Sequence, residues 1–219
     1  NKHIKEKKNR NEFLLSKGHG CLALYSVLFD INKISKKTLL SFTGINSILG
    51  GHPEHFVPLV NFSTGSLGHG LSVAAGMCVG DKILKINKKV FVLLGDGEIN
   101  EGSVWEAALF ISKHKLNNLI TLIDYNKMQS YGKIKDITVL EPLKRKWESF
   151  GFNVSEINGH SINEIDRSIN KAIKKKAKPT VIICNTIKGK GISKIENSPE
   201  WHYKSKLTDK ELEYLKKNL

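Results

Sequence analysis

The chain of 219 residues has few cysteines and no long apolar run, and both features limit the classes of protein to which it can belong. No stretch approaches the roughly 20 consecutive apolar residues that a membrane span needs. Its three cysteines, Cys21, Cys78 and Cys184, lie far apart inside apolar stretches and lack metal-ligand spacing. An odd number of scattered cysteines predicts buried free thiols in a reducing compartment, so we expect a cytoplasmic protein without a membrane anchor.

The sequence also has little that resembles a targeting segment or a linker. Residues 1–10 are polar and lysine-rich with no apolar stretch behind them, which is not the pattern of a signal peptide. The chain begins with Asn rather than Met, so upstream residues can be missing from it. Because no internal repeat or low-complexity linker interrupts residues 1–219, we expect one continuous domain.

Acidic residues are scarce relative to basic ones, since 35 Lys and Arg face 21 Asp and Glu and give a formal net charge of +14. Such an excess can neutralise nucleic-acid phosphates. Here the basic residues collect near the two ends and in residues 171–178, with few aromatic residues among them. We therefore expect a solvated basic surface that helps to steer phosphorylated anions, and no nucleic-acid partner.

Short apolar runs predict the strands of a sheet. Residues 90–94, 119–123 and 180–184 are almost wholly apolar and run into Gly, Asp or Asn, and residues 152–157 are a fourth candidate. Apolar strands without alternation indicate a sheet covered on both faces, which is usually parallel. Helical periodicity lies between the runs, as over residues 66–84. The alternation predicts an α/β, doubly wound, mainly parallel sheet whose ligands collect at the carboxyl ends of its strands.

Polar residues follow two of the predicted strands. Asp96 stands between Gly95 and Gly97 after the first strand, and Asn126 follows the second. Carboxylate and amide oxygens suit a hard cation such as Mg²⁺, which often binds together with phosphates. Glycines beside the carboxylate let backbone N–H groups approach a diphosphate. The 28 residues of 98–125 fit one helix and one strand, so we expect Asp96 and Asn126 at the ends of neighbouring strands.

This spacing resembles the thiamine-diphosphate motif, in which Gly-Asp-Gly is followed by Asn after a helix and a strand. The resemblance implies a thiamine-diphosphate-binding domain in which Asp96, Asn126 and the backbone carbonyl of Met128 hold Mg²⁺. Ca²⁺ or Mn²⁺ can substitute for this ion, and Gly97 would lie beside the diphosphate. Further segments resemble transketolase in particular, in the order of that family and over nearly the whole chain.

Three segments carry histidines that match substrate-facing histidines of the transketolase family. His19 lies in LSKGHG, a segment that faces both the cofactor and the donor sugar in that family. His52 lies in GHPE, and His202 follows Trp201 after the KGKG loop of residues 188–191. The resemblance implies catalytic roles for all three, because imidazole can donate to an oxyanion and can shuttle a hydroxyl proton.

Two more segments match parts of the cofactor site. Residues 64–70, TGSLGHG, resemble the family's glycine-rich turn, in which Gly65, Ser66 and Leu67 would contact the aminopyrimidine ring. Glu101 matches a glutamate of the carboxylate network at the family's subunit interface. The remaining histidines are expected to have structural or surface roles only: His3, His55, His69, His114 and His160.

The resemblance implies ketol transfer, in which the cofactor's carbanion attacks a ketose carbonyl and a two-carbon unit passes to an aldose, as in the pentose phosphate pathway. The cofactor supplies the electron sink, and the protein supplies orientation and electrostatics. A full-length transketolase continues into a pyrimidine-binding domain and a C-terminal domain, which 219 residues cannot house. We therefore expect the N-terminal subunit of a split enzyme, active only with a C-terminal subunit in a dimer of heterodimers.

Two departures from the family pattern leave the sugar substrate open. Residues 130–132 read Ser-Tyr-Gly where many relatives have Ile-Asp-Gly, and Tyr203 stands where many have Gly. A paralogue for an unusual sugar in polysaccharide or modified-sugar metabolism is therefore one alternative. A chain like deoxyxylulose-phosphate synthase is a second, although the segments around His19 and His202 favour transketolase. A non-catalytic, cofactor-binding scaffold subunit is a third.

Overall fold

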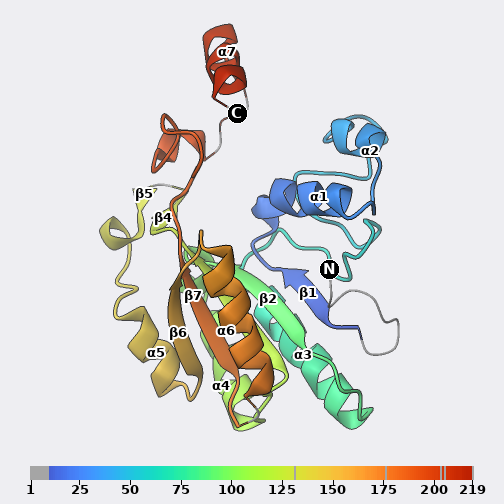
Figure 1. The fold of residues 1–219 in the computed structure, drawn as a ribbon. Helices are drawn as coiled ribbons and strands as arrows, with labels where there is room; N and C mark the ends of the chain where they lie inside the picture. Colours follow the sequence, from blue (N-terminus) through green and yellow to red (C-terminus); the bar gives the residue numbers. More distant parts are fainter. Residues whose placement is uncertain (1–9, 131, 176, 203, 205, 219) are drawn as a thin grey trace.

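The computed structural model describes residues 10–130, 132–175, 177–202, 204 and 206–218. Within them, parallel strands form a five-stranded sheet in the order β1-β2-β3-β7-β6 (Figure 1). These strands are β1 Glu12–Leu15, β2 Val90–Gly95, β3 Leu119–Tyr125, β6 Asn153–Asn158 and β7 Thr180–Asn185. A separate antiparallel ribbon pairs β4 Met128–Gln129 with β5 Gly132–Lys133. The prediction of an α/β, mainly parallel sheet is confirmed.

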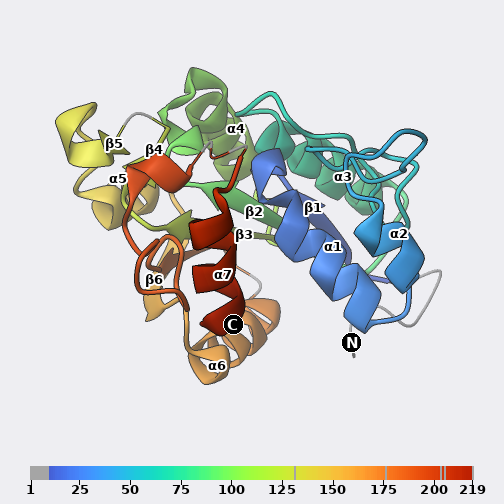
Figure 2. The same cartoon turned by 90° about the horizontal axis from the view of Figure 1, so that it is seen from above.

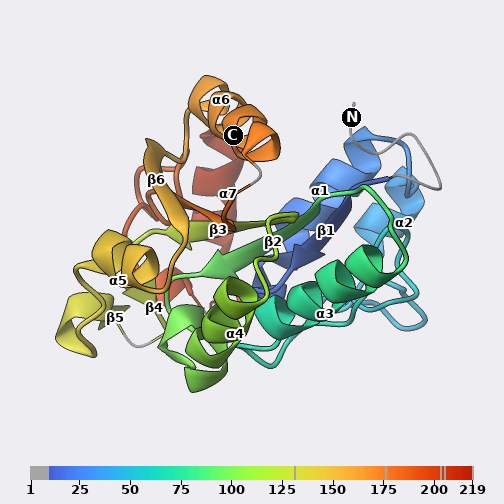
Figure 3. The same ribbon diagram turned by 90° about the horizontal axis from the view of Figure 1, so that it is seen from below.

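Helices cover the sheet on both faces. The α-helices are α1 Cys21–Asp30, α2 Lys36–Leu40, α3 Gly70–Ile83, α4 Gly102–Lys113, α5 Leu143–Ser149, α6 Ile162–Lys174 and α7 Asp209–Lys217. Short 3-10 helices are η1 Gly18–Gly20, η2 Glu98–Asn100, η3 Ile134–Asp136 and η4 Pro199–Trp201. Seen from below, α3, α4 and α5 lie on one side of the sheet and α1 and α6 on the other (Figure 3). None of the described helices is long and apolar enough to cross a membrane.

The alternation of side chains along β2 explains this layering. Val90, Val92 and Leu94 are buried in a cluster with side chains of α3, α4 and α5. Phe91 points to the opposite face and joins the cluster of α6, where Ile169 packs. Successive residues of a strand face opposite sides of a sheet, so an unbroken apolar strand needs a cover on both sides. The prediction that these apolar runs form a sheet covered on both faces is therefore confirmed.

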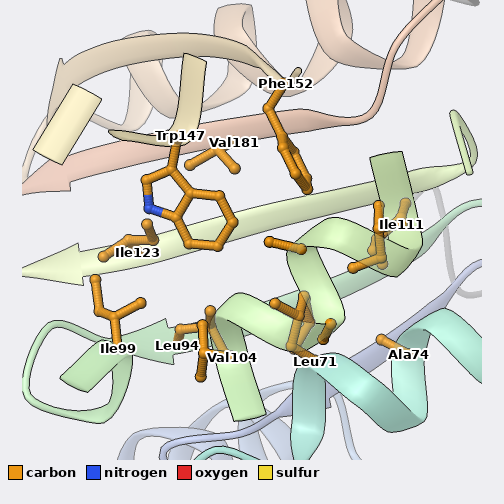
Figure 4. Close-up of a cluster of buried hydrophobic side chains, with 14 of the residues drawn as sticks. Leu71, Ala74, Leu94, Ile99, Val104, Ile111, Ile123, Trp147, Phe152 and Val181 are labelled. Carbon is orange, nitrogen blue, oxygen red and sulfur yellow. The ribbon is translucent and has the colours of Figure 1, made fainter. Parts of the chain in front are cut away.

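The larger cluster centres on Trp147 of α5, which is fully buried (Figure 4). Its ring lies 5.0 Å from that of Trp105 and 5.1 Å from that of Phe152, the latter edge-on. Aromatic pairs in such tilted or edge-on arrangements add to the stabilisation that burial of their area provides. The packing fixes α4 and α5 against the middle of the sheet and so fixes the loops at the carboxyl ends of its strands.

Two boundaries differ from the sequence expectation. The periodicity predicts a helix over residues 66–84, but α3 begins at Gly70. Gly68 has a φ of +84°, which the helix cannot contain, so residues 66–69 form a turn instead. Strand β1 is not among the predicted strands, since its four residues include Glu12 and are too few to stand out as an apolar run.

Candidate functional site

The loops after β2 and β3 meet at the carboxyl edge of the sheet. The two strands pair along their whole length, and Gly95 at the end of β2 lies opposite Asp124 of β3. Asp96 and Asn126 therefore follow the ends of neighbouring strands, as the spacing predicts. Figure 2 views the sheet from above, from this edge, with α1 to one side and α7 in the foreground. This edge is where ligands of doubly wound sheets collect.

Asp96 is a buried carboxylate, with 2% of its surface exposed. Its Oδ1 accepts a hydrogen bond from Gly97 N at 2.8 Å, and its Oδ2 accepts one from Lys127 N at 2.5 Å. Burial raises the pKa of Asp96 to about 6, and the nearby carboxylate of Asp124 adds to this effect. A carboxylate accepts about four hydrogen bonds or metal bonds, so lone pairs remain on both oxygens. A divalent cation there would offset the cost of burying this charge, and the residue fits the predicted metal site.

Asn126 and Met128 lie in the loop that closes over Asp96. Asn126 Oδ1 accepts a hydrogen bond from Met128 N at 3.0 Å, and its Nδ2 donates to Asp124 Oδ2 at 3.5 Å. Among the described residues, no cluster of three or more His, Cys, Asp or Glu side chains could hold a metal ion. The predicted ligands are the carboxylate of Asp96, the amide oxygen of Asn126 and the backbone carbonyl of Met128. Such a set suits Mg²⁺ when phosphate oxygens complete its coordination.

Gly97 lies where the backbone has no room for a side chain. A Cβ on this residue would stand 3.0 Å from Cβ of Gln129, which is in the β4–β5 ribbon. The loop after β2 therefore packs against the loop after β3 at this point. The approach of its backbone to a diphosphate stays a prediction.

Glu98 joins three segments that are far apart in sequence, and no sequence pattern singles it out. Its side chain is 1% exposed. One carboxylate oxygen accepts hydrogen bonds from Ser16 Oγ and from Gly68 N, the latter at 3.0 Å, and the other accepts from Gly95 N at 3.1 Å. A buried carboxylate is tolerated when donors satisfy it in this way. Glu98 thus ties the end of β1, the glycine-rich turn and the end of β2 together.

The glycine-rich turn lies beside this network. Ser103 Oγ donates to Gly68 O at 3.0 Å, and the space above Gly68 is filled by Glu101, the N-cap of α4. Glu101 itself is exposed in this chain. The turn residues Gly65, Ser66 and Leu67 are half-buried or exposed, so they are accessible to a ligand. Their contact with a cofactor ring and the interface role of Glu101 stay predictions.

The three family-matched histidines are brought to the same edge. His19 lies in η1, and its ring centroid is 5.9 Å from that of His202, which directly follows η4. His52 lies against Gly65, since a Cβ added to that glycine would be 3.3 Å from the imidazole. The backbone carbonyl of His52 accepts a hydrogen bond from Tyr25 Oη at 3.0 Å, which anchors its loop to α1. Sequence segments that are widely separated therefore supply one group of imidazoles.

Partial burial and nearby positive charges lower the pKa of two of these imidazoles. The pKa of His19 is lowered to about 4, first by desolvation and then by Lys17, His202, Lys188 and His52. The pKa of His202 is lowered by burial and by the same two lysines. With a pKa of about 4, the His19 imidazole is neutral at neutral pH and can accept a hydrogen bond at one ring nitrogen and donate one from the other.

Two lysines and an aspartate next to the imidazoles were not assigned from the sequence. Lys17 forms an ion pair with Asp124, whose other oxygen accepts a hydrogen bond from Thr186 Oγ1. Burial raises the pKa of Asp124, but the ion pair and the hydrogen bonds outweigh it, so the net shift is downward. Burial, with the charge of Lys17 next in size, lowers the pKa of Lys188. Half-buried ammonium groups at this edge suit an anion such as a diphosphate.

Lys17 and Lys188 both lie inside family-like segments of the sequence, LSKGHG and KGKG. Only the histidines in or near these segments stand out, because a lysine in a basic chain carries little information by itself. Tyr131 and Tyr203, on which the departures from the family pattern depend, lie outside the described residues.

A cavity of about 780 Å³ adjoins this group. Its apolar part lies between α1 and α6 and is lined by side chains such as Leu24, Val27 and Ile165. Its polar end includes Lys17, Asp124, Asn126 and Lys188. The candidate site therefore opens into a groove on the face of the sheet that α1 and α6 share.

Comparison with known proteins gives a matching family and several named relatives. The family described as "Transketolase, thiamine diphosphate binding domain" matches residues 2–219. The chain is 44% identical over 196 residues to a transketolase subunit of Actinobacillus succinogenes named for apulose 4-phosphate, covering 89% of this chain and 71% of that protein. It is 38% identical over 201 residues to a 6-deoxy-6-sulfo-D-fructose transketolase subunit of a Clostridium species, covering 91% and 73%.

Solved structures agree with the sequence relatives. Transketolase from Campylobacter jejuni superposes with a TM-score of 0.85 at 33% identity, over 90% of this chain and 33% of that one. A transketolase variant from Pichia stipitis gives a TM-score of 0.84 at 28% identity, over 98% of this chain and 34% of that one. The chain thus spans about a third of the length of these solved enzymes.

Proposed function

The chain belongs to the transketolase family through its thiamine diphosphate binding domain, and from this premise we propose that it is the N-terminal subunit of a two-chain enzyme. This enzyme transfers a two-carbon ketol unit from a ketose donor to an aldose acceptor. The observation that carries the proposal is one edge of the sheet that combines a buried aspartate, an asparagine and three clustered histidines.

The residues at this edge divide into two tasks. Asp96, Asn126 and the carbonyl of Met128 would hold Mg²⁺, and the backbone at Gly97 with the ammonium groups of Lys17 and Lys188 would face the diphosphate. When bound, thiamine diphosphate supplies the electron sink for breaking and forming the carbon–carbon bond. The remaining tasks belong to the protein.

The histidines would handle the sugar. Because the pKa of His19 is lowered to about 4, its neutral imidazole would accept a hydrogen bond from a sugar hydroxyl or donate one to it, and the pKa of His202 is lowered in the same direction. His52 lies beside Gly65, close to where the glycine-rich turn would meet the cofactor. Its N–H would donate to the oxygen that becomes negative as the donor carbonyl is attacked.

The relatives' names favour an unusual ketose as the donor. Proteins that are 44% and 41% identical to this chain are named for apulose 4-phosphate, and another is named for a sulfonated fructose. The phosphate and the sulfo group in these names are both anionic. We propose that the donor of this enzyme is likewise an anionic, modified ketose, with pentose phosphates as the second candidate.

The names of these relatives also support a partner, since each is called a subunit. We propose a C-terminal subunit that carries the pyrimidine domain, in an assembly of two copies of each chain. The test is to mix the chain with a candidate C-terminal subunit, thiamine diphosphate and Mg²⁺ and to measure ketol transfer from a panel of donors. Xylulose 5-phosphate, apulose 4-phosphate and 6-deoxy-6-sulfofructose would be compared. The proposal fails if the mixture binds thiamine diphosphate but transfers no ketol unit from any of them.

A further inference from the structure

The turn after β6 packs directly against the loop after β7. Gly159 N donates to Asn185 O at 2.8 Å, and a Cβ on Gly159 would stand 2.4 Å from Cγ2 of Thr186. Only glycine allows so close an approach. The turn therefore holds the first residues of the loop that leads to Lys188.

His160 makes the second contact of this turn. Its Nε2 accepts a hydrogen bond from Ile187 N at 2.8 Å, while its own backbone N donates to Asn158 Oδ1 at 2.9 Å. An imidazole nitrogen that accepts a hydrogen bond carries no hydrogen, so in this contact the ring hydrogen of His160 lies on Nδ1. From the sequence, this histidine is expected to have only a structural or surface role, and it is indeed exposed.

The loop that His160 holds is also fixed on its other side. Thr186 N donates to Tyr125 O at 3.1 Å, and Thr186 Oγ1 donates to Asp124. Lys188 follows two residues later, is half-buried, and interacts with the charges of Lys17, Asp124 and Asp96. The backbone of Ile187 is held by His160 immediately before Lys188, whose own carbonyl accepts a hydrogen bond from Asn197 N at 2.9 Å.

We propose that His160 is a positioning residue for the cofactor: by holding Ile187 N, it fixes the Lys188 ammonium at the diphosphate end of the site. This inference rests on the proposed function, because it assumes that a diphosphate binds there. His160 also lines the cavity that adjoins the site, but the proposed role is not a contact with the cofactor or the sugar. It acts only through the loop of residues 186–188.

The contact itself is tested on the 219-residue chain without any cofactor. In a ¹⁵N-labelled sample, a scalar coupling across the hydrogen bond should link Ile187 N to His160 Nε2. Amide exchange at Ile187 should accelerate about two- to tenfold in His160→Ala, which corresponds to the loss of one hydrogen bond. His160→Gln places a carbonyl oxygen near the position of Nε2 and should restore protection. His114→Ala, at the far end of α4, is the matched control and should change nothing at Ile187.

The consequence is tested on the assembly with the C-terminal subunit, by calorimetric titration with thiamine diphosphate and Mg²⁺. His160→Ala should weaken cofactor binding about three- to tenfold, with kcat at saturating cofactor unchanged. His160→Gln should bind as the wild type does. Lys188→Met should weaken binding more, and the double variant should lose little beyond Lys188→Met, because both changes act through one ammonium group.

The outcomes separate the two hypotheses. If the wild-type assembly does not bind thiamine diphosphate, the proposed function fails, and the exchange experiment still decides whether His160 holds Ile187. If the wild type binds and His160→Ala binds equally well, the inference is wrong. It is also wrong if the losses of His160→Ala and Lys188→Met add in full, or if Ile187 exchange is unchanged in His160→Ala.

Discussion

The candidate site has two parts that are built differently. The floor, made of Asp96, Glu98 and Asn126, consists of side chains at strand ends that accept or donate several hydrogen bonds within this chain. The rim, made of His19, His52 and His202, consists of side chains on three separate loops, two of them exposed. The floor is therefore fixed by the sheet of this chain. The rim is open on its outer side, which suits contact with a second polypeptide.

The largest expected effect tests whether the rim is complete without a partner. We expect the purified chain to show no ketol transfer alone and to gain it when the C-terminal subunit is added. The physical reason is that a thiamine-diphosphate site needs a second domain to hold the pyrimidine ring. Coupled assays with and without the partner measure this difference. Turnover by the 219-residue chain alone would contradict the division into floor and rim.

The next effect belongs to the floor. Asp96→Ala should abolish metal-dependent binding of thiamine diphosphate in the assembly, because a metal ligand is removed and each 1.4 kcal/mol lost is about tenfold in affinity. Calorimetry with and without Mg²⁺ measures the loss, and circular dichroism checks that the fold persists. Asn100→Ala alters an exposed neighbour on η2 and serves as the control. Unchanged cofactor affinity in Asp96→Ala would remove this residue from the metal site.

Substitutions in the rim should lower the rate of ketol transfer rather than the affinity for the cofactor. His19→Ala, His52→Ala and His202→Ala should each lower kcat by about 10²–10⁴ and leave cofactor affinity nearly unchanged. His55→Ala, an exposed histidine that contacts Ser63, is the matched control. Steady-state kinetics at saturating cofactor, with a parallel calorimetric titration, separates the two parameters. A variant that keeps full kcat on its true sugars would not belong to the rim.

The smallest effect concerns protonation in the free chain. Because the pKa of His19 is lowered to about 4, its imidazole should stay neutral from pH 8 to pH 5 and titrate only below that range. Two-dimensional NMR of the imidazole nitrogens follows this directly. Lys17→Met removes a nearby positive charge and should raise the pKa. An ordinary titration near pH 6.5 would show that the rim is more solvated than the structure indicates.

The sequence predicted the floor better than its surroundings. Apolar runs revealed β2 and β3, and parallel pairing then required Asp96 and Asn126 to meet at one edge. The role of Glu98 was not predictable, because its partners Ser16 and Gly68 come from segments whose proximity depends on the whole fold. The rim histidines were found only through the resemblance to a family, since no local pattern relates their three loops.

The buried carboxylate of Glu98 has a consequence for how this site can diversify. It binds the end of β1, the glycine-rich turn and the end of β2 into one unit, while the loop of His52 is held by Tyr25 of α1 and by a hydrogen bond from Thr64 N to Pro53 O at 3.1 Å. We therefore expect changes in the His52 loop that keep its contact with Thr64 to leave Asp96 and Asn126 in place. The preference for one sugar over another could then change through substitutions in that loop, or through exchange of the whole loop, while the cofactor-binding residues stay the same.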